Sequence, residues 1–98
     1  MIIKKKIVTI IGLGLIGSSI LRAFSYYLKN KFYIKVYDNN FEHLKVVKSF
    51  NIADEICNSA EESVKESDLV ILAIPVGSMA KVGKLISPYL KKGAILTD

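Results

Sequence analysis

The chain has 98 residues, 51% of them hydrophobic, which allows one small globular domain with a single core and excludes a disordered chain. The net charge of +5 is scattered over fourteen basic residues, of which only Arg22 is an arginine, so the sequence lacks the basic stripe of a nucleic-acid-binding protein. With one cysteine and one histidine, the chain is predicted to have no disulfide and no metal site. It has no signal-peptide pattern, and no apolar run approaches the roughly 20 residues of a membrane span. We therefore predict a cytoplasmic protein without a membrane contact.

Short apolar runs alternate with segments of helical period along the whole chain. The predicted strands are residues 7–11, 32–37, 55–57, 69–74 and 94–97. The predicted helices are residues 16–28, 40–50, a short run after residue 59, and residues 78–92. This alternation is typical of parallel strands joined by crossover helices. It predicts an α/β fold for residues 1–98: a single Rossmann-type, doubly wound parallel sheet of about five strands in the order 3-2-1-4-5, with three to four helices.

Capping and breaking residues set the expected helix ends. Asn39 and Ser59 each precede a helical run and are followed three residues later by glutamate, the pattern of a capping box. Ser78 is expected to open the last helix, which Pro88 should bend or interrupt because proline lacks an amide proton. Gly93 follows two lysines and is expected to take a positive φ at the end of that helix.

Spacings of three and four predict which helical side chains are buried against the sheet. The expected buried positions are Ile16, Ile20, Ala23, Phe24, Tyr27 and Leu28 in the first helix, and Phe41, Leu44, Val47 and Phe50 in the second. The third helix offers few such side chains, so its contacts with the sheet are expected to be sparse. Cys57 lies in a short predicted strand and is interpreted as a buried apolar side chain.

The segment from Gly12 to Gly17 has the spacing Gly-x-Gly-x-x-Gly and lies between an apolar strand and a periodic helix, the context in which this spacing indicates dinucleotide binding. Gly12 allows a tight turn, Gly14 lets a pyrophosphate approach the backbone, and Gly17 lets the helix pack closely on the strand. The amides of Leu15 and Ile16, at the positive end of the helix, are then expected to face the phosphates. The alternative is that the glycines serve only close packing.

An acidic residue ends the second predicted strand, where such folds bind the adenosine ribose. The carboxylate of Asp38 can accept hydrogen bonds from both ribose hydroxyls, and we assign Asn39 to the same site. A 2′-phosphate there would be repelled by an energy on the order of a few kcal/mol. The neighbours Asn39 and Asn40 bring no positive charge, although Lys45 could reach a phosphate. Asp38 therefore favours NAD over NADP; the alternative is a turn or cap residue.

The turn after the fourth predicted strand is apolar. Ile74, Pro75 and Val76 lie at the edge of the sheet where ligands bind in open α/β folds, so we assign them to the cofactor site. An apolar turn suits the edge of adenine or nicotinamide, and it suits plain packing equally well.

Five motifs occur together in one order. They are GLGLIGSS at 12–19, VYD at 36–38, NIAD at 51–54, AIPV at 73–76 and GAILTD at 93–98. In this combination the chain resembles the amino-terminal domain of the prephenate and arogenate dehydrogenases of tyrosine biosynthesis. The resemblance covers essentially the whole chain and implies NAD(P)-dependent oxidative decarboxylation by hydride transfer.

The resemblance also implies roles for particular residues. Gly12, Gly14, Gly17 and Asp38 match the cofactor residues of that family, whereas its catalytic histidine, a Gly-Ser loop and its substrate-binding arginines would lie beyond Asp98. We therefore assign no catalytic residue and expect the chain alone to bind cofactor without catalysing the reaction. His43 lies outside any matching motif and receives no role.

A truncated domain has an exposed last strand. Without the second domain of the family, the strand that contains Ile95 and Leu96 would form a sheet edge with unpaired backbone groups. We expect a homo-oligomer to form through this edge or through the apolar surface that the missing domain would cover.

Two other functions fit the same pattern. One is the first domain of another dehydrogenase or reductase, such as a pyrroline-carboxylate or hydroxyacid reductase. The other is a stand-alone NAD-sensing regulatory domain, which needs no catalytic residues. The sequence leaves open whether prephenate or arogenate is the substrate.

Overall fold

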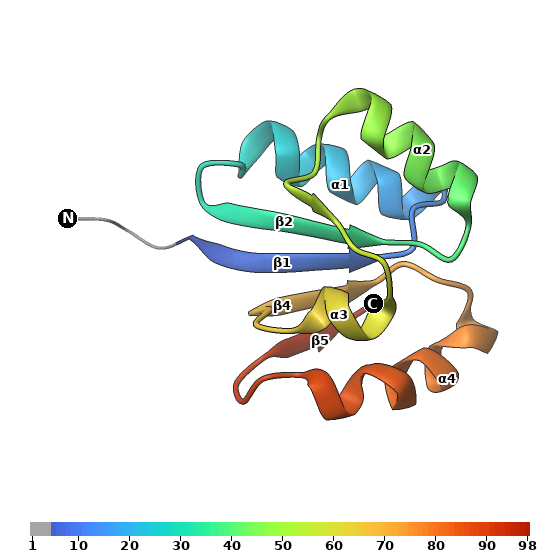
Figure 1. The fold of residues 1–98 in the computed structure, drawn as a ribbon. Coiled ribbons are helices and arrows are strands. Elements are labelled where there is room, and N and C mark those ends of the chain that lie inside the picture. The colour runs from blue at the N-terminus through green and yellow to red at the C-terminus, as the bar shows by residue number, and fades with distance from the viewer. Residues whose placement is uncertain (1–4) are drawn as a thin grey trace.

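The computed structural model describes residues 5–98, and a parallel sheet in the order β3-β2-β1-β4-β5 forms its centre, as the sequence predicts. The strands are β1 (Lys6–Ile11), β2 (Phe32–Tyr37), β3 (Glu55–Ile56), β4 (Leu69–Leu72) and β5 (Ile95–Thr97). The helices are α1 (Leu15–Tyr27), α2 (Phe41–Phe50), α3 (Ala60–Val64) and α4 (Val76–Ile86). Helices α1 and α2 cover one face of the sheet and α3 and α4 the other (Figure 1), so the fold is doubly wound as expected.

Strand β1 is the central strand, hydrogen-bonded to β2 on one side and to β4 on the other. Because side chains alternate along a strand, Val8 and Ile10 join the core beneath α1 and α2, while Ile11 joins the core beneath α3 and α4. Thr9 shares that second face, where its hydroxyl donates a 2.6 Å hydrogen bond to the carbonyl of Ser63 in α3. Burial on both faces explains why the strand is an almost unbroken apolar run.

The buried face of α1 is narrower than its periodicity predicts. Gly17 and Leu21 are buried, while Ile20 and Phe24 pack partly against the core. The positions expected to be buried but found exposed are Ile16, Ala23 and Tyr27. The helix begins at Leu15, beyond the end of β1, so its first turn projects past the sheet and leaves Ile16 in solvent.

Helix α2 covers the sheet only in its middle. Val47 is buried and Leu44 packs partly against the core, but Phe41 and Phe50 are 69% and 60% exposed, contrary to expectation. The strand nearest this edge, β3, has only two residues and therefore offers little surface to the ends of a longer helix. The Phe50 ring instead lies 5.9 Å from the guanidinium carbon of Arg22.

The N-cap of α2 is one residue later than predicted. The side chain of Asn40, not that of Asn39, accepts the amide of Glu42 at 2.9 Å. Ser59 caps α3 as predicted, but the prediction of sparse contacts for α3 is wrong. Three of its five residues are buried: Ala60, Ser63 and Val64.

The last crossover helix also begins earlier than predicted. Helix α4 starts at Val76, with Pro75 as its N-cap, rather than at Ser78. Strand β4 ends at Leu72, two residues earlier than predicted, and the next residue, Ala73, lies against Gly12 of the glycine turn. The expected interruption at Pro88 is confirmed, because the helix gives way to a 3₁₀ turn at Ser87–Tyr89. Gly93 has the expected positive φ of 87°.

Among the described residues, strand β5 pairs only with β4, and its side chains Ile95 and Leu96 are 63% and 44% exposed. The expected apolar edge is therefore present, while self-association through it stays a prediction.

Cys57 is buried as predicted, and burial raises the pKa of its thiol to about 12. Within residues 5–98, no helix combines the length and the apolar composition that crossing a membrane requires.

Candidate functional site

Two glycines hold the β1–α1 turn against the neighbouring strand. Gly12 has a φ of 102°, and a Cβ on it would lie 2.3 Å from the carbonyl oxygen of Ala73. A Cβ on Gly17 would lie 1.8 Å from the carbonyl oxygen of Gly12. No side chain fits at either position, because the first turn of α1 rests directly on the chain that leaves β1. The packing roles predicted for both glycines are confirmed.

The middle glycine of the motif faces open space. A Cβ on Gly14 would meet no atom within 4 Å, and its φ of −70° is open to any residue. Gly14 is the N-cap of α1 and offers no side-chain hydrogen bond, so the first amides of the helix keep their capacity to bind an anion. The side chains of Leu15 and Ile16 at this end are 87% and 71% exposed. This arrangement fits a phosphate lying against the backbone.

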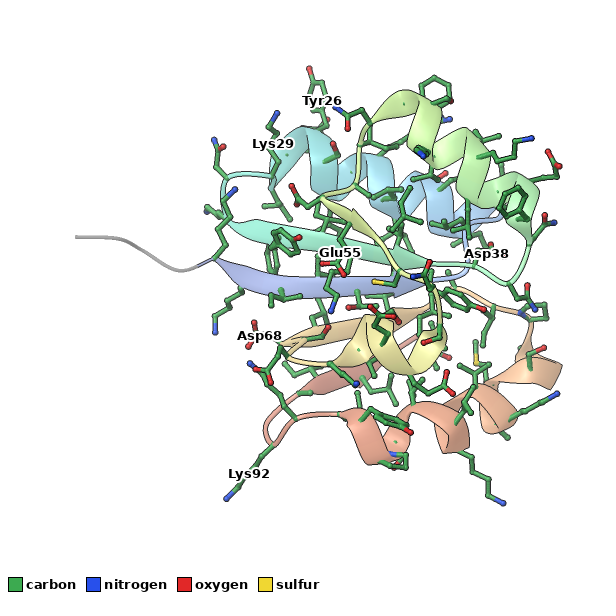
Figure 2. The ribbon with its side chains drawn as sticks, viewed as in Figure 1. Tyr26, Lys29, Asp38, Glu55, Asp68 and Lys92 are labelled. Atoms are coloured by element: carbon green, nitrogen blue, oxygen red, sulfur yellow. The ribbon has the colours of Figure 1, made fainter. Side chains whose placement is uncertain are left out.

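The carboxylate of Asp38 ties the glycine turn to the end of β2. Figure 2 shows Asp38 beside the loop that leads to α2. Its Oδ2 accepts the amide of Leu13 at 2.6 Å, and its Oδ1 accepts the amide of Asn40 at 2.7 Å. The Nδ1 of His43 lies 2.8 Å from Oδ2. Asp38 is 8% exposed, and its side chain thus fixes the spacing between two loops at the carboxyl edge of the sheet.

The hydrogen bonds keep Asp38 charged. Burial alone would raise its pKa, but the bonds from the Asn40 amide, the His43 ring and the Leu13 amide outweigh burial and hold the pKa of Asp38 below its ordinary value. The group is therefore a carboxylate at neutral pH, able to accept hydrogen bonds from hydroxyl groups and to repel a phosphate.

Two cavities flank the glycine turn and share its rim. The first, of about 530 Å³, extends toward α2 and α3, and the second, of about 470 Å³, lies over α1. Both volumes lie in the range of small-ligand sites. The residues common to the two linings are Gly14, Ala73, Ile74 and Pro75. A ligand that spans both cavities therefore passes over this shared rim, to which Gly14 contributes no side chain.

The structure gathers most of the predicted site residues around these cavities. Those lining the first are Gly12, Gly14, Asp38, Asn39, Ile74 and Pro75, and those lining the second include Leu15 and Ile16. Gly17 lies buried beneath the turn. Val76 is 83% exposed and lies outside both linings, since α4 has already begun there and turns it to solvent.

Sequence reasoning missed several residues that line the first cavity, among them His43 and Lys81. His43 is in the first turn of α2, and the tight loop from Asp38 to the N-cap returns its ring to the end of β2. A histidine five residues after the strand-ending acid is the only signal in the sequence, and no spacing rule connects the two. Lys81 reaches the site from α4 and carries no motif at all.

A larger cavity, of about 990 Å³, lies between α2 and β3 and is lined in part by Val47, Ile56 and Cys57. Its lining includes no residue of the glycine turn and none of the three groups that bind Asp38. It lacks the uncapped helix end that favours an anion, so we place the functional site at the glycine turn.

Comparisons with known proteins point to one family. The family described as "Prephenate dehydrogenase, nucleotide-binding domain" matches residues 24–98, a stretch that begins after the glycine turn. The chain is 37% identical over 93 residues to a cyclohexadienyl dehydrogenase of Zymomonas mobilis. The matched stretch covers 95% of this chain and 31% of that dehydrogenase. It is 34% identical over 76 residues to a probable arogenate/prephenate dehydrogenase of Methanocaldococcus jannaschii, covering 76% and 17% of the two chains.

Solved structures share the architecture. A prephenate dehydrogenase of A. aeolicus in complex with hydroxyphenyl propionate and NAD⁺ superposes with a TM-score of 0.83 at 28% identity, over 98% of this chain and 34% of that one. An imine reductase of Myxococcus stipitatus in complex with NAD⁺ reaches a TM-score of 0.78 over 95% of this chain and 31% of that one, but its 19% identity shows the fold alone. The chain spans less than a third of the length of the two curated relatives. By its sequence match over residues 24–98, which its fold supports, the chain belongs to the family of prephenate dehydrogenase nucleotide-binding domains.

Proposed function

We propose that this chain binds NAD⁺ across the carboxyl edge of β1, β2 and β4, as the cofactor-binding part of a dehydrogenase that acts on prephenate or arogenate. The observation that carries the proposal is the gap at Gly14, which joins two cavities at an uncapped helix end with a buried carboxylate beside it. The family match supports the dehydrogenase over a stand-alone NAD-sensing domain, which would use the same groove.

Each part of the groove has a partner in the cofactor. The pyrophosphate lies over Gly14, where the amides at the start of α1 bind it. The adenosine occupies the first cavity and its ribose hydroxyls donate to Asp38. The nicotinamide end enters the second cavity, whose lining is largely apolar and includes Leu15, Ile16 and Met79.

The charge of Asp38 favours NAD⁺ over NADP⁺. A 2′-phosphate near this carboxylate experiences a repulsion on the order of a few kcal/mol at an effective dielectric constant of about 20. Lys81 lines the same cavity from α4 and opposes that repulsion only in part, because Asp38 lies where the ribose is held.

The reaction of the whole enzyme depends on more than these residues. A dinucleotide bound here would supply the hydride acceptor, and the largely apolar lining of the second cavity, which includes Leu15, Ile16 and Met79, would hold its nicotinamide end. Asp98 also lines that cavity. We propose that the substrate-binding and proton-accepting groups come from polypeptide corresponding to the larger part of the curated relatives, which this chain does not span.

A calorimetric titration with NAD⁺, repeated with NADP⁺, tests the proposal. We expect NAD⁺ to bind with a dissociation constant about tenfold lower than that of NADP⁺, which corresponds to about 1.4 kcal/mol. Equal binding would show that Lys81 cancels the charge of Asp38 and would remove the NAD preference. Heat from neither dinucleotide would contradict cofactor binding by this chain.

A further inference from the structure

The carboxylate of Asp38 has little capacity left for a ligand. An ionised carboxylate has about four lone-pair positions on its two oxygens. Three of them are occupied: Oδ2 accepts from the Leu13 amide and from His43 Nδ1, and Oδ1 accepts from the Asn40 amide. Because Asp38 is charged, the Nδ1 of His43 carries the proton in this contact. One position remains open, on Oδ1.

The three donors differ in how easily they can leave. The amide of Leu13 is fixed by the glycine turn, whose Gly12 amide donates to the carbonyl of Tyr37 at 2.9 Å. The amide of Asn40 is fixed because Asn40 is the N-cap of α2. The side chain of His43 is 41% exposed, so its ring can rotate about the side-chain bonds into water. His43 is therefore the one donor that a ligand can replace without moving the backbone.

A ribose with two free hydroxyls needs two acceptor positions on the carboxylate, and Asp38 offers one. Building on the proposed function, we propose that His43 is a specificity-determining residue of the cofactor site. Its Nδ1–H occupies the position on Asp38 that the second adenosine-ribose hydroxyl must take, so NAD⁺ binds only by displacing the ring. His43 also lines the adenosine cavity, so the displaced ring remains beside the ligand.

Two substitutions separate this role from a structural one. His43→Ala removes the donor from Asp38 and frees the second position. His43→Asn keeps an N–H donor close to the place of the imidazole Nδ1, since the two side chains share their geometry as far as that atom. Neither change disturbs the core, because the His43 side chain is partly exposed on the first turn of α2. Circular dichroism of both variants checks that the fold is retained.

Two ligands separate displacement from a general change of affinity. NAD⁺ presents both adenosine-ribose hydroxyls, whereas its 2′-deoxyadenosine analogue presents one and can use the position that is already open. Titration calorimetry at neutral pH should show that His43→Ala binds NAD⁺ about three- to tenfold more tightly than the unsubstituted chain, the size expected for one partly exposed hydrogen bond to a charged group. The affinity for the deoxy analogue should stay unchanged, and His43→Asn should match the unsubstituted chain with both ligands.

The other outcomes overturn the inference in distinguishable ways. Weaker NAD⁺ binding by His43→Ala would show that the ring positions Asp38 for the ribose. An equal gain for both ligands would show that the ring only crowds the cavity. If the unsubstituted chain binds NAD⁺ and the variants do not differ from it, the displacement is wrong and the proposed function stands. If no form of the chain binds either ligand, the displacement of His43 and the proposed function are both wrong.

Discussion

Replacing Gly14 with valine is expected to lower NAD⁺ affinity by about 100-fold or more while leaving the fold intact, because the new side chain excludes the pyrophosphate from two or more charge-assisted backbone hydrogen bonds. A Cβ at this position meets nothing within 4 Å, and the backbone φ of −70° suits a branched residue. The side chain therefore has room in the free chain and projects into the gap between the two cavities. Calorimetry measures the loss of affinity, and thermal unfolding shows that the domain remains folded.

A matched control for this variant lies in α4. A Cβ on Gly83 also meets nothing within 4 Å, and Gly83 lines neither of the two cavities. We expect Gly83→Val to bind NAD⁺ as the unsubstituted chain does. If Gly14→Val binds equally well, the dinucleotide does not cross the glycine turn and the proposed site is wrong. A milder Gly14→Ala substitution gives the same test should the valine variant lose its fold.

Substituting Asp38 with asparagine is expected to reduce both stability and cofactor selectivity. The amide group replaces one acceptor oxygen with an N–H donor, so at least one of the amides of Leu13 and Asn40 or the His43 ring loses its partner. A lost hydrogen bond to a buried charged group costs about 1–3 kcal/mol in unfolding free energy. Without the negative charge, the preference for NAD⁺ over NADP⁺ should fall toward unity. Urea unfolding and paired titrations measure the two effects.

The pH dependence of this variant has a defined sign. The pKa of Asp38 is lower in the folded chain than its ordinary value, so the carboxylate stabilises the fold at neutral pH. That contribution begins to fade as pH falls below about 4, the ordinary pKa of an aspartate, and is lost on passing through the lower pKa of the folded state. The stability difference between the unsubstituted chain and Asp38→Asn should therefore shrink in acid. A difference that grows in acid would contradict the charged, hydrogen-bonded state of Asp38.

Asp54 provides the control for charge removal at a distance from the groove. Its carboxylate accepts the amide of Ile34 at 2.7 Å, as Asp38 accepts backbone amides, but it lines only the cavity between α2 and β3. Asp54→Asn should lower stability without changing the ratio of NAD⁺ to NADP⁺ affinity. A change in that ratio would mean that overall charge, rather than the position of Asp38, sets the preference.

The main strands and the glycine turn were predictable because each depends on local sequence, and the strand order followed from the alternation of strands and helices that is typical of this fold. A strand buried on both faces must be apolar throughout, which identifies β1 and most of β4. The turn requires residues without a Cβ at Gly12 and Gly17, and only glycine meets that requirement.

The helix surfaces were less predictable, since periodicity gives the direction of a side chain but not the extent of the sheet beneath it. Ile16, Phe41 and Phe50 have the correct spacing and are nonetheless exposed, because each lies at a helix end where the sheet offers little surface. The helix starts at Phe41 and Val76 also differ from prediction, since two adjacent asparagines can each cap and a proline can itself serve as the N-cap.

In the candidate site, too, the residues set by local sequence were predictable and those placed by tertiary packing were not. Gly14 and Asp38 were identified because their chemistry is tied to fixed positions in the strand–turn–helix unit. His43 and Lys81 come from helices whose orientation over the sheet edge follows from tertiary packing. A residue that acts through the side chain of another, as His43 does through Asp38, leaves no motif of its own.

The central claim is that a dinucleotide lies across the glycine turn, and NMR spectra of the backbone amides during titration with NAD⁺ test it most directly. We expect the largest shifts in residues 12–16 and 38–43, which surround Gly14 and Asp38, with smaller shifts at residues 73 and 74 on the shared rim of the two cavities. The amides of residues 47–58, around the other cavity, should remain unchanged. Shifts concentrated in residues 47–58, with none in the glycine turn, would contradict the account.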